Sequence, residues 1–488
     1  MPVFSLPDRS GIGDLGPAAY RFVDFLQSAG QGIWQLLPMG PSARGNSPYS
    51  SYSAFAGSPL FISAQGLVEA GLLSESDVSD SDAQADGDYV DYPTVRKARK
   101  AMLRKAFGNF QAGNHSQQQP FDEFCSTNSD WLEDFVLYEA IAEERGDFDW
   151  SHWEVELIQR QDAAMQAARE RLAGEMLFSK FEQFVFQQQW CSLKQYANER
   201  GIRIYGDMPI FVAFESADVW ANQHLYQLGD GGRPLVVAGV PPDYFSETGQ
   251  MWGNPLYAWE RHADSGYEWW IRRLKQALES FDLLRLDHFR GFESYWEIPG
   301  DAENATSGQW KPAPGDALFG AVREALGDVP IVAEDLGLIT DEVHHLRDRL
   351  GFPGMRVLQF GFEHHDDAYH RPEAYPEGSV AYTGTHDNET IMGWYRRRLD
   401  AGVSQDLISP LLSGDPSQVH LDLVRAVMNS AAHTVIIPIQ DLLGLGNEAR
   451  VNVPGEADGN WAWRCANGAL NSDLANVLKD ITEAANRS

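Results

Sequence analysis

Residues 283–288, which read LLRLDH, form a short apolar run that ends in an aspartate and a histidine. A mostly apolar run of this length, without strict alternation, is typical of a parallel strand buried on both faces. The carboxyl end of such a strand is where α/β barrels place their catalytic side chains. The stretch therefore predicts a buried parallel strand with Asp287 and His288 at its functional end.

Seven other runs of the same kind are spread along the chain, and amphipathic helical patterns stand between several of them. Glycine directly after a helical pattern, as at Gly30, Gly201 and Gly351, is a common signal for the end of a helix. Eight strands alternating with helices predict an α/β fold of the (β/α)8 or TIM barrel type rather than an open doubly wound sheet. Besides 283–286, the predicted strands are 3–6, 33–37, 202–205, 331–333, 355–360, 380–383 and 434–439.

Two intervals interrupt this spacing. Residues 64–190 contain helical patterns and an acidic loop but no convincing strand, which predicts a helical insertion subdomain between strands two and three. Residues 1–63 would then hold strands one and two, and residues 191–488 strands three to eight. The second interval, 208–265, is rich in Trp, Tyr, Gly and Pro. Loops this long in a compact fold are usually functional, so we expect it to cover the substrate on the catalytic face.

The composition excludes several classes of function. The 488-residue chain carries a formal net charge of −32, and a surface this negative opposes binding of nucleic acid. No apolar run approaches the roughly 18 residues of a membrane span, and no signal-peptide pattern is present, so we expect a cytoplasmic protein without a membrane partner. The three cysteines are far apart, and nucleotide-binding and zinc-protease motifs are missing. We therefore expect neither a cofactor nor a metal, and we interpret the pairs at 344–345 and 364–365 as solvated histidines.

Carboxylates stand at the ends of four predicted strands. Asp207 follows the third strand, Asp287 the fourth, Glu334 the fifth and Asp387 the seventh. Carboxylates that converge on one pocket raise one another's pKa, which is the property that a glycosidic acid/base pair needs. Arg285, two residues before Asp287, would point to the same side of its strand and hold Asp287 ionised.

Aromatic residues, which make up 12% of the chain, also favour a carbohydrate substrate. Their faces offer apolar surface to the C–H face of a pyranose, while Asp, Asn, Gln and His bond its hydroxyl groups. Several lie in loops beside the predicted strand ends, namely Tyr49, Tyr52, Phe55, Trp220, Tyr244, Phe245, Trp252, Tyr257 and Trp259.

Longer motifs extend along nearly the whole chain. They are SPYSSYSAFAGSPLFI (47–62), GDMPIFV (206–212), GVPPDYFSETGQMWGNPLY (239–257), LRLDHFRGFESYWEIP (284–299), VAEDLG (332–337), YTGTHDNET (382–390), QDLLGLGNEARVNVPG (440–455) and GNWAWR (459–464). In this order they resemble the amylomaltases, which are the 4-α-glucanotransferases of glycoside hydrolase family 77 in the α-amylase superfamily.

The resemblance implies roles for the residues at the matching positions. Asp287 would be the nucleophile that forms a covalent β-glucosyl-enzyme, and Glu334 would be the general acid and then the general base. Asp387 would bind ring hydroxyls of the distorted sugar, a contact that strengthens in the transition state. Arg285 and His386 would orient the nucleophile and the same sugar.

Other positions match substrate contacts of the family. Asp207 matches a further contact residue, and the loop 241–250 resembles the flexible loop that covers the bound glucan. The insertion is similar to the family's helical subdomain. Some members place an aromatic near the position of Arg44 as part of a second glucan site, and PSARGNSPY (41–49) does not predict that site. The residues that match donor and acceptor subsites are Ser47, Tyr49, Gln250 and Trp252.

The implied activity is transfer of α-1,4-glucan segments between maltodextrins, or other glucans derived from starch or glycogen, by a retaining double displacement. Transfer prevails over hydrolysis where acceptor subsites hold the sugar in line and the cleft excludes water, which we assign to the loop 241–250 and Trp252. Two alternatives stay open. One is an α-glucan hydrolase of the same superfamily with the same three carboxylates, and the other is a non-catalytic glucan-binding protein.

Overall fold

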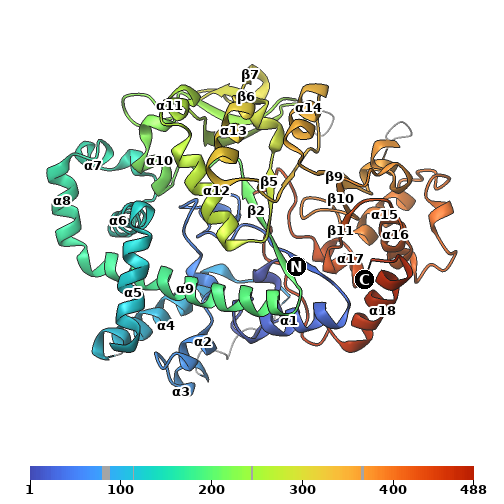
Figure 1. Cartoon of the computed structure of the whole chain (residues 1–488), viewed down its shortest axis with the longest axis horizontal. Helices are drawn as coiled ribbons and strands as arrows, with labels where there is room; N and C mark the ends of the chain where they lie inside the picture. Colours follow the sequence, from blue (N-terminus) through green and yellow to red (C-terminus); the bar gives the residue numbers. More distant parts are fainter. Residues whose placement is uncertain (80–87, 114, 243–245, 364–367, 488) are drawn as a thin grey trace.

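The core of the fold is a parallel sheet that curls into a nearly closed barrel (Figure 1). The computed structural model describes residues 1–79, 88–113, 115–242, 246–363 and 368–487. Within these residues seven parallel strands follow the order β1-β2-β5-β8-β9-β10-β11, and the predicted α/β barrel class is confirmed. The strands are β1 (Ile33–Gln35), β2 (Arg203–Pro209), β5 (Leu283–Asp287), β8 (Ile331–Ala333), β9 (Gly354–Val357), β10 (Ser379–Tyr382) and β11 (Thr434–Ile436).

Strand register brings the predicted site residues together. Asp207 of β2 is the register partner of Arg285 in β5, and Pro209 is the partner of Asp287. On the other side of β5, Leu286 pairs with Ala333, the last residue of β8. Because these strands are parallel, the residues at their carboxyl ends meet at one mouth of the barrel.

The predicted strand at residues 3–6 is wrong. Residues Val3–Ser5 form a 3₁₀ helix, η1, which is closed by a hydrogen bond from the N–H of Leu6 to the carbonyl of Val3. The run is flanked by Pro2 and Pro7, which have no N–H to donate to a strand ladder. An apolar run this short between two prolines is more stable as a tight turn than as a strand.

The predictions 33–37 and 380–383 run two and one residues past β1 and β10. Two other predicted strands extend three residues too far. The prediction 355–360 overlaps β9 but ends inside the 3₁₀ helix η8 (Phe360–Phe362). The prediction 434–439 overlaps β11, but Pro438 ends the extended segment and α17 (Ile439–Leu442) begins directly after it. Proline is compatible with the start of a helix and not with the interior of a sheet, which explains the second error.

Amphipathic helices cover the outside of the barrel, as the alternation predicts. For example, α12 (Glu268–Ser280) contacts β2 and β5 and buries Trp269, Trp270 and Leu274. The helix α14 (Asp341–Leu350) ends at Gly351, which has a left-handed φ of 73° that glycine adopts without strain. The other long helices of this layer are α1 (Pro17–Ser28), α13 (Gly315–Leu326), α15 (Ile391–Asp400), α16 (Val419–Met428) and α18 (Ser472–Ala484).

The described chain between β1 and β2 is mainly helical. Figure 1 shows α4 to α8 on one side of the barrel strands and α15 to α18 on the other. The helical pattern before Gly201 is the end of α9, which runs past residue 190 and contacts β2. We propose that 64–190 is an insertion subdomain anchored to the barrel through this helix. Its helices are α2 (Ala64–Glu69), α3 (Glu75–Ser79), α4 (Tyr92–Gly113), α5 (His115–Thr127), α6 (Ser129–Arg145), α7 (Val155–Ile158), α8 (Asp162–Arg171) and α9 (Ala173–Glu199).

A second, antiparallel sheet was not predicted. Its order is β4-β3-β6-β7, and two of its strands lie in the interval 208–265. A Cβ at Gly239 would lie 2.2 Å from the carbonyl oxygen of Gln250, so only glycine lets these two strands approach there. The strands are β3 (Val236–Val240), β4 (Gln250–Pro255), β6 (Ser294–Pro299) and β7 (Gln309–Pro312).

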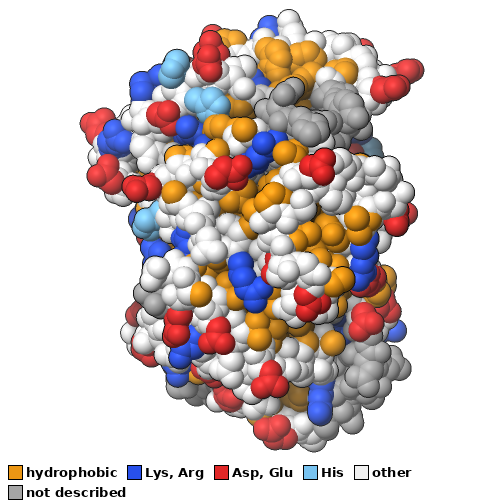
Figure 2. Space-filling view, turned by 90° about the vertical axis from the view of Figure 1, so that its right-hand side faces the viewer, with side chains coloured by type: hydrophobic (Ala, Val, Ile, Leu, Met, Phe, Trp, Pro, Cys, Tyr) orange, Lys and Arg blue, Asp and Glu red, His pale blue; other side chains and the backbone are white. Residues whose placement is uncertain are grey.

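The surface carries charges of both signs. On the face drawn in Figure 2, acidic and basic side chains alternate with hydrophobic ones instead of gathering into one patch. In the described residues, no helix combines the length and the apolar character that crossing a membrane requires.

Candidate active site

A row of three charged side chains crosses β2 and β5 at the barrel mouth. Nη1 of Arg285 lies 2.9 and 2.8 Å from the two carboxylate oxygens of Asp207, and 2.8 Å from Oδ1 of Asp287. Arg285 and Asp207 are buried, whereas the side chain of Asp287 is 28% exposed. Asp287 therefore lies on the solvent side of the row. The buried Arg285 holds it in place through an ion pair.

The charge state of Asp287 reflects opposing effects. Burial raises its pKa from 3.8 to about 6, Arg285 opposes this shift, and the negative charge of Asp207 adds to it. A carboxyl group with this pKa is ionised at neutral pH. Asp287 is therefore available as an anion close to a fixed positive charge.

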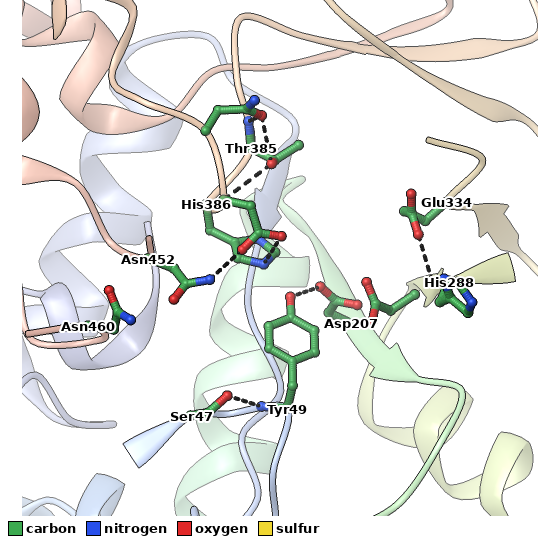
Figure 3. Close-up of polar contacts among 12 residues, drawn as sticks. Ser47, Tyr49, Asp207, His288, Glu334, Thr385, His386, Asn452 and Asn460 are labelled. Carbon is green, nitrogen blue, oxygen red and sulfur yellow. Dashed lines mark hydrogen bonds and ion pairs between the residues drawn. The ribbon is translucent and has the colours of Figure 1, made fainter. Parts of the chain in front are cut away.

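Glu334 directly follows β8 and sits in a different environment. Its Oε2 accepts a hydrogen bond from the backbone N–H of His288 at 2.7 Å (Figure 3). Its Oε1 accepts one from the N–H of Leu336 at 2.9 Å. Burial raises its pKa from 4.5 to about 8, with a further increase from Asp287 and an opposing effect from Arg285. Glu334 consequently retains its proton at neutral pH.

The backbone of His288 is what aims its N–H at Glu334. His288 adopts a left-handed conformation with φ 53° and ψ 49°, which is uncommon for a residue with a side chain. Burial lowers the pKa of its imidazole to about 3, so the ring is neutral. The strained turn after β5 therefore positions the Glu334 carboxyl without adding a charge beside it.

Asp387 lies in the loop that follows β10. The side-chain amide of Asn452 donates to its Oδ1 at 2.6 Å, and Nε2 of His386 lies 3.3 Å from its Oδ2. The loop is closed by Asn388, whose Oδ1 accepts from the N–H and the hydroxyl of Thr385 at 2.8 and 2.9 Å. The carboxylate is half-exposed and held in place from two sides.

Aromatic side chains lie between Asp207 and the loop that carries Asp387. The hydroxyl of Tyr49 donates to Oδ2 of Asp207 at 2.7 Å, and its ring stacks on His386 with 5.1 Å between centroids. Trp461 packs against both rings, at 5.8 Å from Tyr49 and 5.7 Å from His386. Ser47 accepts a hydrogen bond from the N–H of Tyr49 at 3.3 Å (Figure 3).

A cavity of about 570 Å³ opens beside Asp287, and Ser47, Tyr49, Trp252 and His288 are among the residues that line it. Trp252 is 39% exposed, and its ring packs perpendicular to that of His288 with 4.8 Å between centroids. Its indole N–H donates to the side-chain oxygen of Gln250 at 3.1 Å. Gln250 is the last residue of the predicted covering loop 241–250, of which residues 243–245, including Tyr244 and Phe245, lie outside the described chain.

Comparison with known proteins identifies the family. The family model described as 4-alpha-glucanotransferase matches residues 1–470. The chain belongs to this family. It is 45% identical over 487 residues to a 4-alpha-glucanotransferase of Synechocystis, with 99% of this chain and 96% of that protein covered. The corresponding values for a 4-alpha-glucanotransferase of Thermus thermophilus are 44% over 490 residues, 99% and 97%.

A solved structure agrees with this assignment. The amylomaltase from Streptococcus agalactiae in complex with acarbose superposes with a TM-score of 0.96 at 38% sequence identity, covering 100% of this chain and 98% of that one. The predicted relationship to the amylomaltases and 4-α-glucanotransferases is thereby confirmed.

The site predicted from the 4-α-glucanotransferase motifs is assembled in space, with one distinction among its members. Asp287, Glu334 and Asp387 lie around the barrel mouth with His386, Ser47, Tyr49 and Trp252, and Gln250 supports Trp252. Asp207 and Arg285, predicted as substrate contacts, are buried. Arg285 contacts Asp287 and Asp207, and Asp207 accepts a hydrogen bond from Tyr49.

Sequence reasoning missed two members of the site, Asn452 and Trp461, and it placed His288 at the functional end of its strand without its backbone contact to Glu334. Asn452 and Trp461 both lie inside motifs quoted above, but no single-residue pattern distinguishes them. Asp335 stands at a strand end beside Glu334 but does not belong to the site. It points into the fold, where it accepts a hydrogen bond from the N–H of Met355 at 2.6 Å. Neighbouring acids on a strand end face opposite ways, so only one of them reaches the cleft.

The described residues contain no group of three or more His, Cys, Asp or Glu side chains arranged to hold a metal ion. The second histidine pair lies in residues 364–367, outside the described chain.

Proposed function

We propose that this member of the 4-α-glucanotransferase family transfers α-1,4-glucan segments between maltodextrins through a covalent glucosyl-enzyme. The observation that carries the proposal is the contrast between two carboxyl groups at one barrel mouth. Asp287 is ion-paired with Arg285 at 2.8 Å, whereas Glu334 is half-buried, and removal from water gives it the higher pKa although two backbone N–H groups oppose that shift. An ionised nucleophile next to a protonated acid is the arrangement that a retaining glycosidic reaction uses.

In the first half-reaction a carboxylate oxygen of Asp287 attacks the anomeric carbon of the donor. The bond from that carbon to the glycosidic oxygen breaks, and the Glu334 proton passes to this oxygen, so the leaving glucan departs as an alcohol. The product is a glucosyl ester of Asp287 and an ionised Glu334.

In the second half-reaction Glu334 acts as the base. The 4-hydroxyl of an acceptor glucan gives its proton to the Glu334 carboxylate and attacks the same anomeric carbon. The ester bond to Asp287 breaks, and both carboxyl groups return to their initial protonation states. Two inversions at one carbon retain the α configuration.

The remaining side chains have supporting roles in this proposal. Asp387, held by Asn452, and His386 bind ring hydroxyls of the reacting sugar. Arg285 and Asp207 are positioning residues, because their contacts orient Asp287. The subsite residues on either side are Ser47, Tyr49, Gln250 and Trp252.

The donors and acceptors that we propose are maltodextrins, including those derived from starch or glycogen. The exposed indole of Trp252 beside the cavity offers an apolar platform for an acceptor sugar, which would exclude water from the intermediate. The Streptococcus agalactiae amylomaltase, which was solved in complex with acarbose, supports a glucan-like ligand in this cleft.

A product profile tests the proposal. Purified protein is incubated with maltotriose alone, and products are separated over time, with Glu334→Gln as the inactive control. We expect glucose together with maltodextrins longer than the substrate. Glucose and maltose without longer products would favour the hydrolase, and binding without turnover would favour the non-catalytic protein.

A further inference from the structure

A second charged cluster, made of residues other than the carboxylates described above, lies in the active-site cavity. Nη1 of Arg233 lies 3.3 Å from Oδ2 of Asp149, and Nη2 lies 2.7 Å from Nε2 of His152. Arg233 belongs to the turn before β3, whereas Asp149 and His152 belong to the helical insertion. Both Arg233 and Asp149 line the cavity that also contains Asp287.

The contacts fix the orientation of the guanidinium. Because Arg233 has only donors, Nε2 of His152 accepts its hydrogen bond, so the other ring nitrogen carries the hydrogen and donates to Asp147 at 2.8 Å. A guanidinium has five N–H groups, and these two partners leave donors for a ligand in the cavity. The Arg233 side chain is 56% exposed at this position.

The backbone beneath the cluster is closely fitted. Gly232 has a φ of 77°, and a Cβ there would lie 2.5 Å from the buried ring of Trp150, so the turn seats directly on the insertion. The indole N–H of Trp150 donates to the carbonyl of Phe214 at 2.8 Å. Asp149 also caps the 3₁₀ helix η4 (Trp150–His152), since its Oδ1 accepts from the N–H of Ser151 at 3.1 Å. Arg233 is thus presented from a preorganised support.

The lining of the cavity shows on which side of the reacting bond Arg233 lies. Among the described residues, the lining includes Trp252 and His288, the latter being the backbone partner of Glu334. It does not include Asp387, His386 or Asn452, and it reaches His386 only through Tyr49, whose ring stacks on that histidine. A glucan that runs from Asp287 past His288 and Trp252 toward Arg233 extends on the side of Glu334, which is the side of the leaving group and of the acceptor.

We propose that Arg233 binds hydroxyl groups of a glucose unit in an outer subsite on the acceptor side, and that it thereby favours long glucans over short ones. This inference rests on the proposed function and deepens it. The planar fork of the guanidinium can donate to two neighbouring sugar oxygens, and Oδ2 of Asp149 can accept from a hydroxyl. Maltotriose, which has fewer glucose units to place outward from Asp287, should depend less on this contact than maltoheptaose does.

The test compares a short and a long substrate in each variant. Initial rates give kcat/KM for maltotriose and maltoheptaose with the wild type, Arg233→Ala, Arg233→Lys and the control Arg261→Ala, whose side chain is 68% exposed and pairs with Asp264. We expect Arg233→Ala to lower kcat/KM for maltoheptaose about tenfold and for maltotriose by less than about twofold, the size of one charge-assisted hydrogen bond. Arg233→Lys should be intermediate because it lacks the fork.

A binding measurement separates this inference from the proposed function. In the Glu334→Gln background, calorimetry gives Kd for both sugars with and without Arg233→Ala. A tenfold loss of affinity for maltoheptaose, without a loss for maltotriose, supports the subsite. This result would support it even if the wild type failed to turn over maltotriose, which would contradict the proposed function. An equal effect on both sugars, or no effect on either, would overturn the subsite.

Discussion

Arg285 and Asp287 stand two residues apart on one strand and share an ion pair, with Nη1 of the guanidinium 2.8 Å from Oδ1 of the carboxylate. The same nitrogen contacts Asp207 on the neighbouring strand. The proposed nucleophile is therefore positioned by a charge that is itself held by a second, fully buried carboxylate.

Replacing Asp207 with Asn should weaken both the fold and the reaction. Breaking a buried ion pair from one side leaves Arg285 partly uncompensated, so we expect the free energy of unfolding to fall by about 3 kcal/mol. We expect kcat to fall at least about tenfold, because a poorly held nucleophile loses its attack geometry. Urea unfolding and initial rates measure the two effects. Asp24→Asn, which breaks an exposed pair with Arg200, is the control and should change stability by less than about 1 kcal/mol. An Asp207→Asn variant with wild-type kcat would argue against the positioning role.

The pH profile of kcat/KM should be bell-shaped. Activity requires ionised Asp287, so it should be lost as the pH falls through about 6. It also requires protonated Glu334, so it should be lost as the pH rises through about 8. Because the two carboxyl groups interact, the two apparent pKa values of the profile belong to the pair and not to either residue alone. A profile that stays flat from pH 5 to pH 9 would rule out this assignment.

Glu334→Gln should stabilise the protein at alkaline pH. The folded-state pKa of Glu334 is about 8 against 4.5 for an unperturbed glutamate, so the folded state binds the proton more tightly. Stability then decreases as the pH rises from about 4.5 to about 8, and the variant escapes this loss. We expect its advantage over the wild type to be at least about 1 kcal/mol larger at pH 9 than at pH 5, by urea unfolding at both pH values. Glu324→Gln, an exposed substitution on α13, should show no such difference. An advantage that is equal at both pH values would contradict the protonated state.

Asn452 should affect activity through its hydrogen bond to Asp387. Asn452→Ala removes the 2.6 Å hydrogen bond to Oδ1, and we expect kcat/KM to fall about tenfold because the carboxylate loses its orientation. Asn452→Asp should be more damaging, since it places a second negative charge against the first. The control is Asn109→Ala, whose amide bonds the carbonyl of Leu72 in the insertion. Equal activity in the two Asn452 variants would show that charge beside Asp387 is unimportant.

Much of the fold could be predicted because the signals are local. The runs that form β5 and β8 are apolar, short and followed by polar residues, so both the strands and the ends that carry Asp287 and Glu334 are visible in the sequence. The same criterion failed at residues 3–6, where flanking prolines turn an apolar run into a 3₁₀ helix. Apolarity predicts burial, but it does not by itself predict a ladder partner.

The parts that could not be predicted depend on long-range contacts. The β3–β4 pairing requires close approach at Gly239, and the bond from Asn452 to Asp387 joins residues 65 positions apart. Arg233 and Asp149 are 84 residues apart and meet only because the insertion packs against the turn before β3. One sequence gives no signal for such pairs, whereas the family motifs located the carboxylates.

Trapping the intermediate tests the nucleophilic role of Asp287 most directly. The Glu334→Gln variant is mixed with α-maltosyl fluoride, whose fluoride leaves without a proton, so the first half-reaction proceeds and the second, which needs the base, stalls. Proteolysis and mass spectrometry then locate the sugar. We predict a maltosyl group on Asp287, which is lost when Asp287→Asn is added. A maltosyl group on Asp387, or fluoride release in this variant without any covalent adduct, would contradict the double displacement.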